Sequence, residues 1–128
     1  MLDGIQNAIT PGPMQLQEQK RAGVKYDNNK PPVMRGVIRY FPRALRQVAK
    51  VSQAGARKYT WEGWRTVPDG ENRYADARAR HELAYAMGEF LDVDTETMHL
   101  AQVAWNALAE LELVMVRLEQ IYEQPGTK

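Results

Sequence analysis

The clearest pattern along the chain is a polar line on an otherwise apolar surface between residues 81 and 110. At about 100° of rotation per residue, polar side chains fall on one face of a helix predicted for residues 81–92. This line consists of His81, Tyr85, Glu89 and Asp92. A second helix, predicted for residues 96–110, carries a similar line. That line consists of His99, Gln102, Asn106 and Glu110.

A connection of only three residues, 93–95, predicts that these two helices pack antiparallel with their polar lines facing each other. The expected cross-helix pairs are Asp92 with His99, Glu89 with Gln102, Tyr85 with Asn106, and His81 with Glu110. Polar groups buried between helices are costly unless each is hydrogen-bonded or coordinated. A divalent cation and its substrate would supply such partners.

Glu89 and Asp92 are the sharper part of this signal. Carboxylates three residues apart on a helix lie one turn apart, and together they can hold one hard cation through oxygen ligands. The alternative is a solvated acidic surface, because this spacing is common on exposed helices.

Further acids follow in the predicted turn and the start of the next helix, where Asp92, Asp94 and Thr95 can cap that helix. Capping needs only one such oxygen. The cluster offers five carboxylates, namely Glu82, Glu89, Asp92, Asp94 and Glu96.

The remaining pattern is also helical. A helix is predicted to start at Pro42 and to weaken or end near Gly55. The helix that carries the first polar line is predicted to be capped by Asn72 and to contain residues 74–91. The helix that carries the second polar line is the last one. It is predicted to continue past Glu110, to run for nearly thirty residues and to stop before Pro125. It carries more apolar surface than a small domain can cover, so we expect self-association.

Length and composition fit one all-α domain. A chain of 128 residues accommodates a single modest core, predicted for residues 23–128, preceded by an irregular arm at residues 1–22. A net charge of +1 favours neither long nucleic acids nor anionic membranes. Without cysteine there is no disulfide or thiolate metal site. No membrane span and no signal peptide are recognisable, so we expect a cytoplasmic protein.

A segment rich in cations and aromatic residues, 56–65, follows the helix that starts at Pro42. In the functional interpretation, Trp61 and Trp64 form a shelf for a nucleobase, while Lys58 and Arg65 bind phosphates. In the alternative, the tryptophans pack beneath a loop and the cations face solvent.

Two lysines, Lys25 and Lys30, lie on a loop rich in turn-forming residues. Lysines on an ordered loop can reach phosphates, and the alternative is that both are simply solvated.

Taken in order, these segments resemble a known family. The sequences are GVKYDNNKPP, FPRALRQVAKVSQAGARKYTWEGW and RHELAYAMGEFLDVDTETMHLAQVAWNALAELE. They are similar to the phage and prophage dATP/dGTP diphosphohydrolases, MazG-like enzymes of the all-α nucleotide pyrophosphohydrolase type. The resemblance extends from residue 23 to about residue 113 and implies a MazG-like helical bundle.

The resemblance implies Mg²⁺- or Mn²⁺-dependent hydrolysis of dGTP or dATP to the monophosphate and pyrophosphate. The enzyme would be a homodimer or homotetramer in the cytoplasm of an infected or lysogenic bacterial host. Its metal ligands would be drawn from Glu89, Asp92, Asp94, Glu96 and His99. Glu89, Asp92 and His81 would be the catalytic residues, with His81 or a nearby carboxylate accepting a proton, and Asn106 would position a ligand or the sugar.

One departure from the family pattern concerns the metal. MazG-like enzymes usually carry a Glu-x-x-Glu pair on the preceding helix, whereas the stretch from Ala44 to Gly55 contains no acidic residue. Two other functions remain open on the residues alone. One is a non-catalytic helical phage accessory protein, whose polar lines would be interhelical hydrogen bonds that fix the register. The other is the same chemistry on a pyrimidine deoxynucleotide.

Overall fold

The computed structural model describes residues 23–123, and the arm predicted for residues 1–22 lies outside the described residues. Within the described range the chain is helical, which confirms the predicted all-α class. The elements are the short π-helix η1 (Met34–Ile38), α3 (Pro42–Lys58), the 3₁₀ turn η2 (Gly63–Thr66), α4 (Gly70–Ala86) and α5 (His99–Tyr122).

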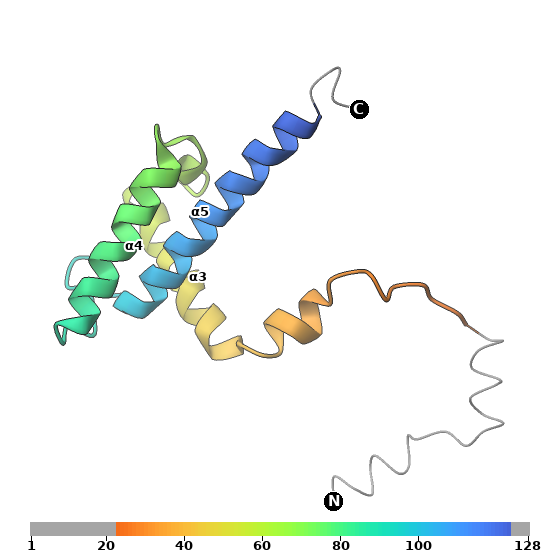
Figure 1. Cartoon of the computed structure of the whole chain (residues 1–128). Helices are drawn as coiled ribbons and strands as arrows, with labels where there is room; N and C mark the ends of the chain where they lie inside the picture. The colour runs from red at the N-terminus through yellow and green to blue at the C-terminus, as the bar shows by residue number, and fades with distance from the viewer. Residues whose placement is uncertain (1–22, 124–128) are drawn as a thin grey trace, which may run out of the picture.

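The central unit is an antiparallel pair formed by α4 and α5, with α3 packed across the first half of α5 (Figure 1). Three aromatic rings from separate elements, Trp64, Tyr74 and Trp105, meet edge to face with centroids 5.7 to 6.4 Å apart. Their polar atoms are also bonded, because the Tyr74 hydroxyl donates to the Trp64 carbonyl and Trp105 Nε1 donates to Ser52 Oγ. This aromatic cluster fixes α3 and α4 against α5.

The helix predicted to extend to Asp92 ends earlier, at Ala86. Gly88 adopts a left-handed φ of 97°, and its N–H donates to the Tyr85 carbonyl. The N–H of Glu89 reaches back to the Ala84 carbonyl at 3.0 Å. These two bonds form a Schellman C-cap, for which glycine is the favoured residue. Glu89 and Asp92 therefore lie in a loop, and the prediction that they sit one helical turn apart is wrong.

The loop that follows is held by its own backbone. An antiparallel bridge joins Leu91 to Met98, the Asp92 N–H donates to the Thr97 carbonyl, and the His99 N–H donates to the Phe90 carbonyl. Predicted caps of α5 act within this loop instead, since Asp92 Oδ1 accepts from the Asp94 N–H. No side chain caps α5 at its N-cap residue, Met98.

This longer loop changes the register between α4 and α5. His81 lies opposite His99, with ring centroids 5.1 Å apart, and not opposite Glu110 as predicted. Glu110 instead forms an ion pair with Arg78 at 3.0 Å. The two polar lines do face each other. Asp92 lies within 4.8 Å of His99, as predicted, but Gln102 bonds Asp92 and Glu89 approaches His99.

The other helix boundaries agree only in part with the prediction. The start of α3 at Pro42 and the end of α5 before Pro125 are as predicted. In contrast, α3 continues through Gly55 to Lys58, and α4 starts at Gly70, before the predicted cap Asn72. The last helix has 24 residues, fewer than predicted.

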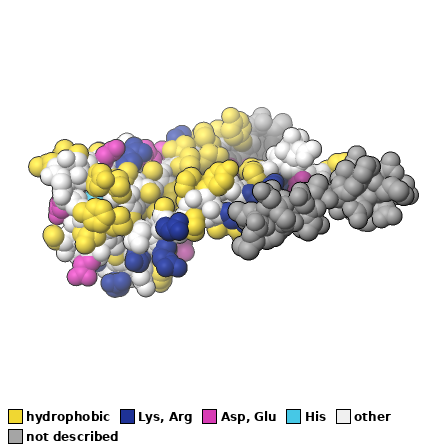
Figure 2. Space-filling view, turned by 90° about the horizontal axis from the view of Figure 1, so that it is seen from below, with side chains coloured by type: hydrophobic (Ala, Val, Ile, Leu, Met, Phe, Trp, Pro, Cys, Tyr) yellow, Lys and Arg dark blue, Asp and Glu magenta, His cyan; other side chains and the backbone are white. Residues whose placement is uncertain are grey.

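The core is small. Among the described residues only Val51, Ala101 and Ala109 are buried hydrophobic side chains. Many large apolar side chains are exposed, and Figure 2 shows hydrophobic side chains spread over one face of the bundle.

Candidate functional site

A cleft of about 1170 Å³ lies between α3, η2, α4 and the first turns of α5. Its walls include Lys58 at the end of α3, His81 on α4, and Asp92 and Asp94 from the loop. The aromatic cluster forms another part of its lining. This volume is ample for a nucleotide, since ligand clefts commonly measure about 300–1,000 Å³.

Three potential metal ligands from three segments meet at one end of this cleft. His81, Asp92 and His99 each offer a ligand atom, and these atoms lie within 4.8 Å of one another. The two imidazoles are closest, with 2.9 Å between their Nδ1 atoms. His81 is half-buried and His99 is 5% exposed. These residues are called the histidine–aspartate cluster below.

The protonation of the two imidazoles follows from their spacing. Two ring nitrogens at hydrogen-bond distance share at most one proton, so each ring presents a lone pair in at least one arrangement. Burial lowers the pKa of His81, although the Asp92 carboxylate opposes that shift. The neutral ring, which is the metal-binding form of histidine, is therefore favoured at neutral pH.

His99 also has an unsatisfied nitrogen. Its Nε2 is buried and makes no hydrogen bond among the described residues, although Glu89 Oε2 lies 3.4 Å away. A small rotation of the half-exposed Glu89 side chain would complete an Nε2–H···carboxylate bond. That bond would leave His99 Nδ1 unprotonated and facing His81, as in carboxylate–histidine–metal arrangements.

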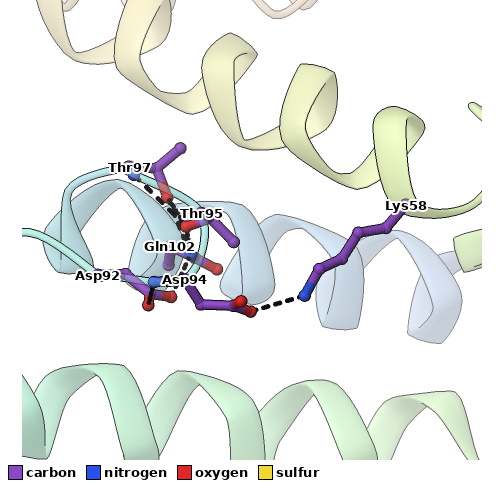
Figure 3. Close-up of polar contacts among 6 residues, drawn as sticks. All are labelled: Lys58, Asp92, Asp94, Thr95, Thr97 and Gln102. Atoms are coloured by element: carbon purple, nitrogen blue, oxygen red, sulfur yellow. Dashed lines mark hydrogen bonds and ion pairs between the residues drawn. The ribbon is translucent and has the colours of Figure 1, made fainter.

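A hydrogen-bond network fixes Asp92 (Figure 3). Gln102 Nε2 on α5 lies 3.0 Å from Asp92 Oδ2 and 2.9 Å from the hydroxyl oxygens of both Thr95 and Thr97. Its two N–H groups are thus shared among three acceptors. Because Gln102 and Thr97 are buried, this network ties the loop to the rigid start of α5.

Lys58 and Asp94 form an ion pair across the cleft, with 2.6 Å between Nζ and Oδ2 (Figure 3). The hydrogen bond to Asp94 raises the pKa of Lys58. Both side chains are about half or more exposed, so the pair is weak and exchangeable. A phosphate or a cation entering the cleft would compete with it.

The two tryptophans predicted to form an aromatic shelf differ in their surroundings: Trp64 packs against other rings and Trp61 is exposed at the cleft. Trp64 belongs to the aromatic cluster, and the Arg65 guanidinium lies 4.7 Å from its ring centroid. Trp61 lines the cleft and is 63% exposed, with the 77% exposed Tyr59 nearby on the same wall. Trp61 and Tyr59 therefore have free ring surface for stacking.

The structure brings only some of the predicted site residues to the cleft. The predicted residues in its lining are Lys58, Trp61, Trp64, His81, Asp92, Asp94 and Asn106. Asn106 is buried and donates from Nδ2 to the Gln102 carbonyl. Glu89 and His99 do not line the cleft, but His99 adjoins two lining residues, His81 and Asp92, and Glu89 lies 3.4 Å from His99.

Four predicted residues lie elsewhere. Glu96 is exposed on the outside of the loop with φ of 60°. Arg65 is paired with Glu62, at 2.6 Å. Lys25 and Lys30 are exposed on the N-terminal segment and do not line the cleft.

Several lining residues were not predicted, among them Arg73, Arg80 and Tyr59. The sequence alone does not single out Arg73 and Arg80, because only the helix register shows which arginines of α4 face the cleft. Gln102 was placed on the polar line, but its role in holding Asp92 depends on the loop conformation.

The histidine–aspartate cluster fits a divalent cation. Ligands that bind one ion at about 2.0–2.1 Å are separated by roughly 2.9–3.0 Å when they are adjacent at a right angle. The two Nδ1 atoms are 2.9 Å apart, and Asp92 adds a carboxylate oxygen.

Comparisons with known proteins add one finding. A family model described as dATP/dGTP diphosphohydrolase, N-terminal, matches residues 20–121. No curated protein and no solved structure matches the chain. The match covers most of the chain and includes every residue of the cleft, so this protein belongs to the dATP/dGTP diphosphohydrolase N-terminal family.

Proposed function

We propose that this protein hydrolyses dATP or dGTP to the monophosphate and pyrophosphate with the help of a divalent cation. The histidine–aspartate cluster, set in the wall of a nucleotide-sized cleft, is the observation that carries the proposal. The family description supports the deoxypurine substrate.

The cation would be held by His81, Asp92 and His99. Of the two candidate cations, Mn²⁺ accepts imidazole ligands more readily than Mg²⁺. When bound, the cation would lower the pKa of a water molecule and neutralise charge on the phosphates. Glu89 would act behind His99 by orienting its ring.

The other residues would bind and orient the nucleotide. Lys58, Arg73 and Arg80 provide positive charge along the cleft for the phosphates. Trp61 and Tyr59 would stack on the base, and the buried Asn106 would position the sugar.

The proton of the attacking water needs an acceptor. Asp94 is the exposed carboxylate on the cleft wall, and it becomes free when Lys58 turns to a phosphate. Water then attacks the α-phosphorus in line with the departing pyrophosphate, and Asp94 takes the proton. Water and the triphosphate are consumed, and one monophosphate and one pyrophosphate are formed.

The proposed function includes self-association as a homodimer or homotetramer. The small core and the many exposed apolar side chains support it. None of the described helices is long and apolar enough to cross a membrane. We place the reaction in the cytoplasm of an infected or lysogenic bacterial host, where deoxynucleotides are available.

The decisive experiment is incubation with each deoxynucleoside triphosphate in turn, with Mn²⁺ or Mg²⁺, followed by separation of the products. We expect monophosphate and pyrophosphate, fastest from dATP or dGTP. Faster hydrolysis of a pyrimidine substrate would keep the reaction and change the base. Release of single phosphates, or no release, would reject the proposed reaction.

A further inference from the structure

The outer face of α3 carries a straight row of four basic side chains. Their spacing of three, four and seven residues places them within an arc of about 60° around the helix and over a length of about 21 Å. All four are exposed. The opposite face of α3 carries the buried Val51 and packs on α5, where Ser52 accepts from Trp105 (Figure 1). This α3 basic row consists of Arg43, Arg46, Lys50 and Arg57.

The α3 basic row has no acidic partner. Among the described residues, none of its four side chains forms an ion pair. The basic residues that do pair with a carboxylate lie outside the row, namely Lys58, Arg65, Arg78 and Arg117. The net charge of +1 hides this separation, because residues 42–58 contain five basic and no acidic side chains, whereas residues 59–123 contain five basic and thirteen acidic ones.

The position of the row does not stabilise the helix that carries it. Arg43 and Arg46 lie in the first turns of α3, where the helix dipole disfavours cations. Like charges four residues apart, such as Arg46 and Lys50, repel each other. Because both effects cost free energy, we attribute the row to an anionic ligand and not to the stability of α3.

The length and surroundings of the row select the kind of anion. A single triphosphate is shorter than the row, whereas a DNA duplex carries a phosphate about every 3.4 Å along each strand, so the row spans about six of them. Membrane-surface helices add large apolar side chains to their cations, and single-strand binders add aromatic ones. The side chains between the cations of this face are all small or uncharged, namely Pro42, Gln47, Ala49, Gln53 and Ala54.

We propose that the α3 basic row binds the phosphate backbone of double-stranded DNA without reading its sequence. Phosphate contacts position a protein on a duplex but carry no sequence information. The acidic remainder of the bundle repels the duplex and so confines its contact to this face of α3. The inference goes beyond the proposed hydrolysis and does not depend on it, because none of the four cations lines the cleft.

Fluorescence anisotropy of a labelled DNA duplex tests the proposal, with the full-length protein and without nucleotide or divalent cation. The logarithm of the association constant should fall with the logarithm of salt concentration at a slope of about −3 to −4, since each neutralised phosphate contributes about −0.9. In Arg46→Gln/Lys50→Gln the slope should shrink to about −2, and binding at low salt should weaken about tenfold or more. Absence of binding by the wild type, or an unchanged slope in the variant, would overturn the proposal.

Arg65→Gln/Arg117→Gln is the matched control. It removes the same net charge from two exposed arginines that lie outside α3 and pair with carboxylates. Its affinity for the duplex and its salt slope should stay close to those of the wild type. Equal losses in the two double variants would show that overall charge matters, and would contradict a specific role for the row.

The fold and the reaction provide further readouts. Glutamine keeps the helix propensity of α3 and removes like-charge repulsion, so Arg46→Gln/Lys50→Gln should melt at the same or a higher temperature. A lower melting temperature would make the row structural and would overturn the proposal. Hydrolysis of dGTP should be unchanged in this variant, so that failure of duplex binding is distinguished from failure of the proposed function.

Other occupants of the row give different results. A smaller species of Arg46→Gln/Lys50→Gln in light scattering without DNA would overturn the proposal in favour of a second copy of the chain. Tighter binding to vesicles of anionic lipid would overturn it in favour of a membrane surface. Tighter binding to single-stranded DNA or to an RNA duplex of the same length would likewise contradict a site for double-stranded DNA.

Discussion

The loop beside the cleft and the segment of residues 23–41 differ in the side chains that they bury and expose. At the loop, Thr97, His99 and Gln102 are buried polar side chains whose atoms are almost all bonded within the chain. In residues 23–41, large apolar side chains such as Tyr26 and Tyr40 are exposed to solvent. Burying polar groups and exposing apolar ones both cost free energy. The first is compensated by hydrogen bonds within the chain, and the second has no compensation among the described residues.

The largest effect is expected when the charge of Asp92 is removed. Asp92→Asn keeps the size of the side chain and one of its two acceptor oxygens, but it removes the negative charge of the histidine–aspartate cluster. Turnover should fall by about a thousandfold or more, the scale of losing a metal ligand or a transition-state charge contact. Steady-state hydrolysis of dGTP measures it.

Glu82→Gln is the control for that change. Glu82 is exposed on α4 next to His81 and does not line the cleft. It should keep activity within about twofold, since it contacts neither substrate nor cluster. Equal losses in the two variants would mean that overall negative charge matters, and not the position of Asp92.

Gln102→Leu tests whether the loop depends on its network. The substitution leaves Asp92, Thr95 and Thr97 oxygens without their shared donor, at a cost of about 2–4 kcal/mol of unfolding free energy. Urea denaturation measures this cost. Gln120→Leu, an exposed position late on α5, should change stability by about 0.5 kcal/mol or less. Similar values for the two variants would contradict the importance of the network.

The end of α4 is tested by a pair of glycine substitutions with opposite signs. Gly88→Ala puts a Cβ at a φ of 97° and should destabilise the fold by about 1–2 kcal/mol. Gly55→Ala lies within α3, where an added Cβ meets nothing within 4 Å, and should stabilise by about 0.5–1 kcal/mol. Thermal melting of both variants checks the signs, and a stabilising Gly88→Ala would show that the Schellman cap is not needed.

The smallest effect on the unfolding free energy of the single chain is expected from substitutions in residues 23–41. Met34→Ser/Val37→Ser changes side chains that are 52% and 44% exposed and are not covered by the bundle. In dilute protein the unfolding free energy should change by about 0.5 kcal/mol or less. Under the proposed self-association, stability of the same variant at high concentration should fall below that of the wild type, because fewer apolar side chains remain for the interface. A large loss of unfolding free energy in dilute protein would mean that residues 23–41 pack against the bundle of their own chain.

Much of the fold was predictable because it depends on local signals. Pro42 marks the start of α3, and the long apolar pattern before Pro125 marks α5. The polar lines also identified His81, His99 and Asn106, since helical periodicity places them on inward faces whatever the exact register. Asp92 was identified too, but it reaches the cluster from a loop and not from a helix.

The detailed site was less predictable. Gly88 carries a recognisable stop signal, but the 3.6-residue periodicity continues past it to Asp92 and favours a longer helix. Ending α4 at Ala86 moves Glu89 off the helix and brings His81 to His99.

The central claim is that His81, Asp92 and His99 bind one divalent cation. The most direct measurement is electron spin-echo modulation of Mn²⁺ added at one equivalent to the full-length protein. The account predicts modulation from directly coordinated imidazole nitrogen, weakened in His99→Ala, lost in His81→Ala/His99→Ala and unchanged in Glu82→Gln. Mn²⁺ that binds without nitrogen modulation, or that does not bind, would contradict it.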